Sequence, residues 1–430
     1  MTTRPDLTAL DAVLTRAALG HAVAGAAVCL IDGRTEQRAT TGVRRIGDPA
    51  VVSPDTVFPL GSVTKIVVAT LVCRLAAAGR LDLDDPVGAT VPELALLGDR
   101  GTTITARMLL SHSSGLVDAW DDSGSLAELL VATGLFAEPG TVFSYSNTGY
   151  VVLGRLIENL YATSWEEAAR HEVLAPAGAT SAVFTTPSAA AAGHVLNDHG
   201  VLVAGDLWPP VSSLFGAAGA TMHATAADTA RLVLACASGR TADGTQLLPV
   251  SMRDEMLRQQ IALPGAPLHF HGWGLGWALP APTATRGATA RRVVEHIGGT
   301  NAFVHVEPDR GLALAVLTNF PEGWALGEDV LRGALGHRRD LPPIGPGPDD
   351  VHPYLGEYRS PAFGVTVRMA LDGRLRITNP LTGGETDLHH QHGDSFWADF
   401  GDLVSEVSFL VDGGRARHVH TALRMLQRAD

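Results

Sequence analysis

Hydrophobic and polar positions follow a strand-like pattern at both ends of the first 335 residues of this chain. An apolar run over 26–33 closes on an Asp-Gly turn, and its partner strand is expected at 36–45. Strands are expected again at 293–297, 301–306 and 312–318, the last two joined by Pro-Asp-Arg-Gly. The region between is mostly helical. Strands at both ends with helices between them predict an α+β domain whose sheet joins distant segments.

Two helical segments stand out within this domain. Residues 62–78 are largely apolar and end before Gly79, which predicts a buried helix. Residues 1–20 have the pattern of an amphipathic helix, without the apolar stretch or cleavage site of a signal peptide. Apolar residues never run uninterrupted for 18 positions, so we expect no membrane segment and a cytoplasmic protein.

The pattern changes beyond residue 335. Residues 336–350 are rich in Pro, Gly and charge, with four prolines within 342–348, which is typical of a semi-rigid linker. Period-2 segments then surround Asp-Gly turns at 372–373 and 412–413, and they predict a small antiparallel sheet or barrel. The expected organisation is therefore an α+β domain over 1–335, a linker over 336–350 and an all-β domain over 351–430.

Composition narrows the possible functions. The chain has 430 residues, of which 46% are hydrophobic and 18% charged, enough apolar material for folded domains. Its formal net charge of −13 does not favour a nucleic-acid partner. Cys29, Cys73 and Cys236 all lie in apolar runs, so we expect buried free thiols rather than disulfides.

The basic residues contain an unusual contrast, because the chain has 31 arginines and one lysine, Lys65. A composition that uses Arg wherever a positive charge suffices suggests that this position needs an amine able to lose its proton. Ser62 and Lys65 are three residues apart at the start of the buried helix, so their side chains share one face. The helix N-terminus favours developing negative charge on Ser62, and apolar surroundings lower the pKa of an amine so that it can act as a base.

Two further segments carry candidate chemistry. Tyr145-Ser146-Asn147 lies in a loop, where the phenol can move a proton and the Asn amide can bind a carbonyl. His296-Ile297-Gly298-Gly299 ends a predicted strand, where the His can hydrogen-bond the phenol and the glycines let a backbone N–H point into a site. Taken singly, each segment is better interpreted as structural, with a packed Tyr in an ordinary turn and a His that serves the fold.

Together these segments resemble the serine β-lactamase and penicillin-binding-protein superfamily, in particular its class-C-like branch of esterases, D-aminopeptidases and carboxypeptidases. The resemblance covers about residues 10–335. It rests on five segments, namely Ser62-Val63-Thr64-Lys65, 109–116 (LLSHSSGL), Tyr145-Ser146-Asn147, 272–277 (GWGLGW) and His296-Ile297-Gly298. It implies a β-lactamase/transpeptidase-like fold, followed here by a lipocalin-like β domain.

The resemblance also implies roles for these residues. Ser62 would be the acylated nucleophile, and Lys65, Tyr145 and His296 would complete the catalytic group. Asn147 and Gly298 would contact the substrate, and the N–H groups of Ser62 and Gly299 would form the oxyanion hole. It implies no metal and no cofactor.

One departure from the superfamily pattern bears on the substrate. The third motif usually begins with Lys where a substrate carboxylate is gripped, whereas this chain has His296. A neutral imidazole is a poor carboxylate clamp, which disfavours a β-lactamase or a D-Ala-D-Ala carboxypeptidase. Without a leader peptide, cell-wall chemistry is also disfavoured.

The layout resembles the penicillin-binding-protein-type thioesterases, which release and macrocyclise nonribosomal peptides with D-residues from carrier proteins. It is also similar to D-stereospecific aminopeptidases and esterases that carry lipocalin-like extra domains, and the sequence leaves both open. We therefore expect a small-molecule or peptide substrate, presented on a carrier protein in the thioesterase case, and neither nucleic acid nor membrane as a partner.

The sequence disfavours three other kinds of protein or site. An α/β-hydrolase needs a Gly-x-Ser-x-Gly elbow, which the chain lacks. A non-catalytic penicillin-recognition module would normally have lost Ser, Lys or Tyr from the trio. The histidines of the C-terminal region lack the Cys or carboxylate residues that would accompany them in a metal site; they are His389, His390, His392, His418 and His420. Arg424 and Arg428 are expected at the solvated surface.

Overall fold

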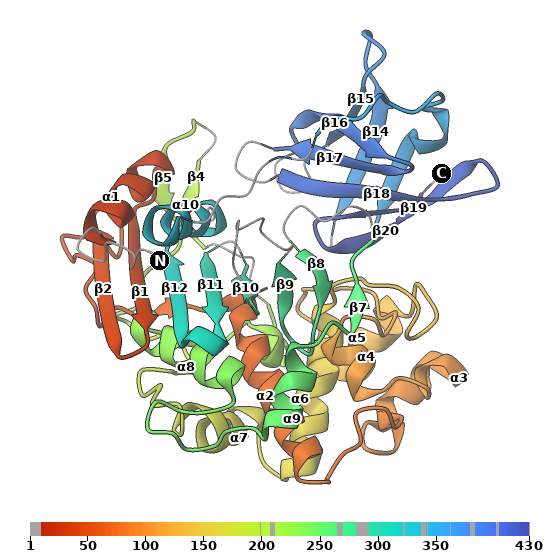
Figure 1. Cartoon of the computed structure of the whole chain (residues 1–430). Helices are drawn as coiled ribbons and strands as arrows, with labels where there is room; N and C mark the ends of the chain where they lie inside the picture. Colours follow the sequence, from red (N-terminus) through yellow and green to blue (C-terminus); the bar gives the residue numbers. More distant parts are fainter. Residues whose placement is uncertain are drawn as a thin grey trace.

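The computed structural model shows two parts, a helix-covered sheet and a β-barrel (Figure 1). It describes residues 10–429 except 198, 207–210, 265–269, 281–291, 300, 321–322, 337–340, 342, 362, 379–382 and 401–403. The sheet part ends with α10 (Gly323–Leu335) and the barrel begins with β13 (Gly356–Arg359). The domain boundaries at 335/336 and 350/351 stay predictions.

The sheet has eight antiparallel strands in the order β2-β1-β12-β11-β10-β9-β8-β7. Its first and last segments meet, since Ala26 of β1 pairs with Thr318 of β12. This confirms that the sheet joins distant parts of the chain. The strands are β1 (Gly25–Asp32), β2 (Thr35–Gly42), β7 (Ile261–Ala262), β8 (Phe270–Trp273), β9 (Ala278–Pro280), β10 (Val294–Gly298), β11 (Ala302–Glu307) and β12 (Leu312–Thr318).

Every residue of β12 is buried because both faces of the sheet are covered. Ala313, Ala315 and Leu317 belong to the core shared with α2 (Thr64–Ala77) and α8 (Ala226–Ser238). The alternate residues Leu312, Leu314 and Val316 face the second core, which α1 (Leu10–Gly20) and α10 complete. Alternate side chains of β12 therefore pack into the helical layers on the two opposite faces of the sheet (Figure 1).

Further helices and two small β-ribbons complete the sheet-containing part. The helices are α3 (Gly98–Gly101), α4 (Ala106–Leu110), α5 (Leu126–Thr133), α6 (Asn147–Tyr161), α7 (Trp165–Ala169) and α9 (Val250–Leu257). Two small ribbons pair β3 (Phe58–Pro59) with β6 (His223–Ala224), and β4 (His194–Leu196) with β5 (Leu202–Ala204).

The C-terminal part is a closed barrel of eight consecutive antiparallel strands, completed by pairing of β13 with β20. Alternation places Val365 and Val367 of β14 inside and Arg368 outside, as the hairpin pattern predicted. The other strands are β14 (Gly364–Met369), β15 (Leu375–Thr378), β16 (Glu385–His392), β17 (Ser395–Asp399), β18 (Val404–Asp412), β19 (Arg415–Thr421) and β20 (Arg424–Arg428).

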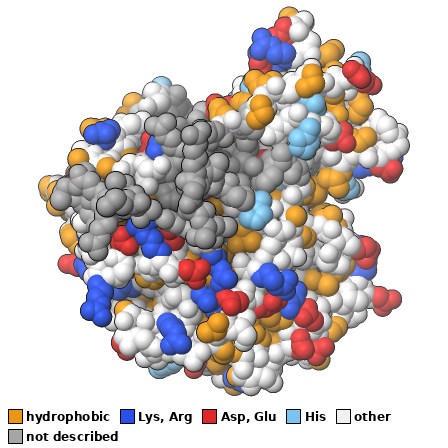
Figure 2. All heavy atoms as spheres, viewed as in Figure 1, with side chains coloured by type: hydrophobic (Ala, Val, Ile, Leu, Met, Phe, Trp, Pro, Cys, Tyr) orange, Lys and Arg blue, Asp and Glu red, His pale blue; other side chains and the backbone are white. Residues whose placement is uncertain are grey.

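Three other expectations can be compared with the structure. The three cysteines are buried and free, as predicted. Within the described ranges, no helix has the length and apolar character needed to cross a membrane. On the face drawn in Figure 2, acidic and basic side chains are interspersed over the sheet-containing part rather than gathered into a basic patch.

Candidate active site

Ser62 and Lys65 lie where the chain enters α2, a helix that is buried along most of its length. Ser62 is in the 3-10 turn η2 (Gly61–Val63), which runs directly into α2. Eleven of the fourteen residues of α2 are buried, because its apolar side chains cover its whole circumference. Lys65 is 0% exposed, and its Nζ lies 3.0 Å from Ser62 Oγ. The predicted nucleophile and base are therefore in direct contact.

The Lys65 amine has three hydrogen-bond partners: Ser62 Oγ, Asn147 Oδ1 at 2.7 Å and the Ala218 carbonyl oxygen at 2.5 Å. A neutral amine has two N–H donors and one lone pair. Asn147 and Ala218 offer only acceptor oxygens here, so they take the two N–H groups. The lone pair of the neutral amine then faces the Ser62 hydroxyl, which is the geometry of a general base.

Burial lowers the pKa of Lys65 well below its ordinary value, while the nearby Asp118 carboxylate raises it and Arg424 lowers it. Burial has the opposite effect on a phenol and raises the pKa of Tyr145 well above its ordinary value. The Ser62 hydroxyl lies near the phenol and partly offsets this rise, although the two groups do not reach normal hydrogen-bond geometry. Lys65 is thus suited to accept a proton, and Tyr145 to remain a protonated phenol.

The Tyr145 segment is fixed from two sides. Ser146 caps α6 by accepting a hydrogen bond from the Gly149 N–H at 3.1 Å. His112, in a left-handed conformation with φ of 56°, accepts the Ser146 N–H through Nδ1 and stacks on the Tyr145 ring at 4.1 Å. His112 belongs to the 109–116 segment, but the sequence alone gave it no role. Here it orients the phenol.

The structure corrects the expected partner of His296. Its ring does not hydrogen-bond the Tyr145 phenol; instead Nδ1 lies 2.9 Å from the Ile297 carbonyl oxygen. A carbonyl can only accept, so Nδ1 carries the proton and Nε2 has the lone pair. Burial, followed by the charge of Lys65, lowers the pKa of His296 to about 3. The ring is thus a neutral hydrogen-bond acceptor. This agrees with the expectation that the imidazole at this position is a poor clamp for a substrate carboxylate.

Polar atoms without protein partners converge on this region. Tyr145 Oη, His112 Nε2 and His296 Nε2 are all buried and make no hydrogen bond to the described part of the chain. Trp273 packs edge-on against the Tyr145, His112 and His296 rings at centroid distances between 5.2 and 5.8 Å. Unpaired polar groups inside an aromatic wall are what a substrate-binding site provides.

The predicted oxyanion donors belong to two segments in very close contact. A Cβ on Gly61 would lie 2.7 Å from the Gly298 carbonyl carbon and 3.0 Å from the Gly299 nitrogen. Gly61 has a φ of +51° and Gly299 a φ of +58°, so both backbones use conformations that favour glycine. The glycines thus let the end of β10 lie against the Ser62 turn, which places both predicted N–H donors in one region.

The barrel reaches this site through its last turn, Thr421–Arg424, which joins β19 to β20. The Tyr145 N–H donates to the Leu423 carbonyl at 2.8 Å, and Ser144 Oγ accepts the Met425 N–H at 3.1 Å. Leu423 also packs against the small apolar cluster that includes Tyr145 and Trp273. Figure 1 shows the barrel above the β7–β9 end of the sheet.

Arg424 is not a solvated surface residue, contrary to the sequence-based expectation. Its Nε donates to Asp118 Oδ2 at 2.5 Å, and its guanidinium lies 5.0 Å from the Tyr145 ring centroid. Asp118 is only 4% exposed and also accepts the Asn147 N–H at 2.7 Å. Arg428 bonds inside the barrel, to the Tyr358 hydroxyl and the Ala416 carbonyl. Asp118 was not identified from sequence at all.

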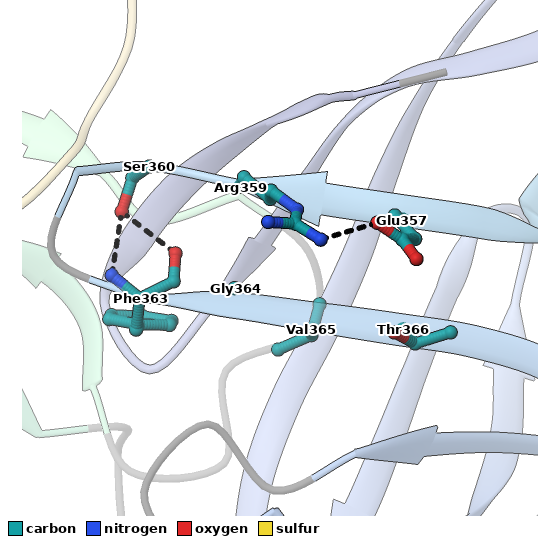
Figure 3. A pocket seen from close by; sticks show the side chains of 7 residues that line it. All are labelled: Glu357, Arg359, Ser360, Phe363, Gly364, Val365 and Thr366. Atoms are coloured by element: carbon teal, nitrogen blue, oxygen red, sulfur yellow. Dashed lines mark hydrogen bonds and ion pairs between the residues drawn. The ribbon is translucent and has the colours of Figure 1, made fainter.

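A cavity of about 420 Å³ lies on the barrel, beside β13, β14 and the segment that joins them (Figure 3). Phe363 is one of its lining residues and lies 5.8 Å from the Arg424 guanidinium. Among the other lining residues, Arg359 pairs with Glu357. None of the predicted catalytic residues lines this cavity.

The histidines of the barrel do not assemble a metal site in the described ranges, where no group of three or more His, Cys, Asp or Glu side chains has ligand geometry. His420 is instead buried against Phe143, with ring centroids 5.8 Å apart. Burial lowers its pKa to about 4, so it is neutral at physiological pH.

Comparison with known proteins shows the family to which this chain belongs. Residues 10–335 match the beta-lactamase family. Penicillin-binding protein 4 of Amycolatopsis lactamdurans is 32% identical over 363 residues, covering 79% of this chain and 93% of that protein. The chain belongs to the beta-lactamase family, whose fold here carries a serine-hydrolase type of site, and it ends in a lipocalin-like eight-stranded barrel.

Two solved structures extend the likeness. The crystal structure of SurE covers 98% of this chain and 99% of its own, with 26% identity and a TM-score of 0.74. A D-stereospecific amidohydrolase from Streptomyces sp. covers 78% of this chain and 100% of its own, with 26% identity and a TM-score of 0.63. The likeness to SurE thus includes the barrel.

Proposed function

We propose that this protein is a serine acyltransferase that releases a peptidyl group from a thioester or ester and closes it head to tail. The observation that carries the acyl-enzyme step is the fully buried Lys65 amine 3.0 Å from Ser62 Oγ. Cytoplasmic location and a carrier-bound nonribosomal peptide substrate are part of the same proposal.

The first half-reaction transfers the acyl group to the enzyme. Ser62 Oγ attacks the carbonyl carbon while its proton passes to the neutral Lys65 amine. The N–H groups of Ser62 and Gly299 receive the developing oxyanion, and Asn147 Nδ2 binds the neighbouring substrate carbonyl. The C–S or C–O bond of the donor then breaks, and the leaving thiol or alcohol takes up the proton, with the Tyr145 phenol as the relay.

The second half-reaction decides between cyclisation and hydrolysis. The terminal amine of the same peptide attacks the Ser62 ester, loses a proton to Lys65 and forms the amide, and Ser62 leaves as its hydroxyl. An amine wins over water when the bound chain holds it at high effective concentration. The contact of the β19–β20 turn with Tyr145 supports this, because apolar Leu423 packs beside the phenol and limits the access of water there.

A D-configured residue at the acylating end is supported by the relatives. SurE has been crystallised with D-Leu, in a structure that covers 98% of this chain with 26% identity. The Streptomyces amidohydrolase is D-stereospecific by name. That enzyme also supports the second candidate, a D-stereospecific aminopeptidase, amidase or esterase. A non-catalytic binding module is opposed by the intact Ser62, Lys65 and Tyr145 constellation.

The test supplies a peptidyl thioester with a free N-terminal amine and a D-configured C-terminal residue, and separates the products by mass spectrometry. Cyclic peptide is the expected product, and the matching L-residue thioester is the control. Only linear acid, together with rapid cleavage of D-amino-acid amides or simple esters, would favour the hydrolase candidate. Absence of any acyl-enzyme mass would refute both.

A further inference from the structure

A continuous chain of polar contacts leads from the barrel to the nucleophile. Arg424 Nε donates to Asp118 Oδ2, and the other oxygen of Asp118 accepts the Asn147 N–H. Asn147 Oδ1 accepts from Lys65 Nζ, which contacts Ser62 Oγ. Each of these four links measures between 2.5 and 3.0 Å. None of the catalytic roles assigned above uses Asp118 or Arg424.

Asp118 occupies a position where a carboxylate has a specific effect. Asn147 is the first residue of α6, and its N–H is one of the donors that a helix leaves without an intrahelical acceptor. A carboxylate at that point satisfies the donor and interacts favourably with the helix dipole. It therefore fixes the start of α6, and with it the Asn147 side chain that holds Lys65.

A buried carboxylate this close to the site needs a counter-charge, because an unpaired buried charge is strongly destabilising. Arg424 supplies it from the far end of the chain, 306 positions away. The turn that presents Arg424 is itself strained, since Ala422 and Leu423 have φ values of 48° and 64° although neither is glycine. Left-handed non-glycine residues persist where surrounding contacts impose them, often at functional sites.

We propose that Asp118 is a positioning residue of the active site, completed by Arg424 of the barrel. The pair holds Asn147, and through Asn147 the Lys65 amine, in the geometry needed for acylation of Ser62. The barrel is then part of the catalytic apparatus rather than an appendage. This inference rests on the acyl-enzyme step proposed above.

The same pair sets the charge that Lys65 experiences. Asp118 favours the protonated amine and Arg424 opposes it, so that the two effects offset one another. The other titratable groups around the amine are electrically neutral, because burial keeps the imidazoles unprotonated and the phenols protonated; they are His112, His296, Tyr145 and Tyr150. Removing one member of the pair therefore leaves one uncompensated charge near Lys65.

The test measures the rate of Ser62 labelling by a fluorophosphonate as a function of pH in the full-length protein. Arg424→Gln is expected to lose about tenfold in rate at neutral pH, because the reacting groups are displaced. The pH at which the labelling rate falls on the acid side of the profile, its acid limb, should rise by about one unit. The reason is that the remaining Asp118 carboxylate stabilises the protonated Lys65 amine. Asp118→Asn should move the limb in the opposite direction by about one unit.

Further variants separate positioning from simple loss of folding. The double variant Asp118→Asn/Arg424→Gln removes both charges and should return the limb to its wild-type position. Arg424→Lys keeps the charge and should stay within about threefold of wild type, because the ion pair survives at lower geometric quality. Arg417→Gln and Asp412→Asn, which change exposed residues of the neighbouring β18–β19 hairpin, are the charge-matched controls.

Limbs and rates that match the controls in both single variants would overturn this inference while leaving the acyl-enzyme proposal intact. Equal shifts in the same direction would also overturn it, because opposite charges must act oppositely. Failure of the wild-type protein to label at any pH would instead refute the acyl-enzyme step, and this inference with it.

Discussion

Replacement of Lys65 by Met tests whether the amine is uncharged in the folded protein. Burial lowers the pKa of Lys65 well below its ordinary value, whereas in the unfolded chain it titrates near the usual value of about 10.4. Between these two pKa values the unfolded chain binds one proton that the folded protein does not. The free energy of unfolding of the wild type therefore rises with pH in this window.

For a difference of one bound proton, the free energy of unfolding of the wild type should rise by about 1.4 kcal/mol for each pH unit. Met has a similar length and no charge, so the variant lacks this contribution. The variant also leaves the Asn147 and Ala218 oxygens without their donor and the Ser62 hydroxyl without its acceptor, which costs a constant amount at every pH. The contribution of the amine is therefore the change with pH in the difference between the two free energies of unfolding. Other titrating groups contribute equally to both proteins and cancel in this difference.

The assay is urea unfolding at pH 8.0 and 9.0, followed by tryptophan fluorescence, with the buried Trp273 and Trp277 reporting on the sheet part. Relative to Lys65→Met, the wild type should gain about 1.4 kcal/mol between these pH values. A difference independent of pH would mean that Lys65 is protonated when folded. That result would refute its role as the resting base.

Three further substitutions test the site itself. Ser62→Ala should abolish covalent labelling and lower turnover by about 10³-fold or more with an unchanged melting temperature, so undiminished labelling would exclude Ser62 as nucleophile. Lys65→Arg should be nearly as inactive as Lys65→Ala in ester hydrolysis, because guanidinium stays protonated; an active Arg variant would contradict the base assignment. Gly61→Ala places a Cβ 2.7 Å from the Gly298 carbonyl carbon and should slow labelling by about tenfold or more, whereas a normal rate would show that the contact with β10 is dispensable.

Long periodic segments made much of the fold predictable from sequence. The apolar runs at 26–33 and 312–318 correspond to β1 and β12, and the apolar stretch at 62–78 corresponds to η2 and α2. These elements were recognisable because their pattern of apolar positions extends over many residues. The strands β7 to β9 were not predicted. They have two to four residues each, and the glycines of 272–277 interrupt any alternation.

The catalytic pair was predictable because Ser62 and Lys65 are neighbours on one helix, where spacing alone brings them together. The contact between Asp118 and Arg424 had no such local signal. The turn carrying Arg424 lacks the Asn-Gly that usually marks two left-handed residues, so the sequence did not indicate its conformation. The expected His296–Tyr145 hydrogen bond was wrong because the Ile297 carbonyl, in the adjacent residue, holds the imidazole instead.

The charges around Ser62 restrict what kind of substrate end the site can receive. Burial lowers the pKa of His296 to about 3 and the pKa of Lys65 well below its ordinary value, which favours their neutral forms, and Arg424 is already paired with Asp118. A carboxypeptidase substrate brings a free carboxylate next to its scissile amide, and an aminopeptidase substrate brings an ammonium group. Neither would meet an unpaired opposite charge among these residues. A peptidyl thioester or ester brings no charge beside its reacting carbonyl, because the carboxyl group is itself the one being transferred. This charge distribution favours the proposed acyl transfer from a thioester or ester over the second candidate, hydrolysis at a charged peptide end.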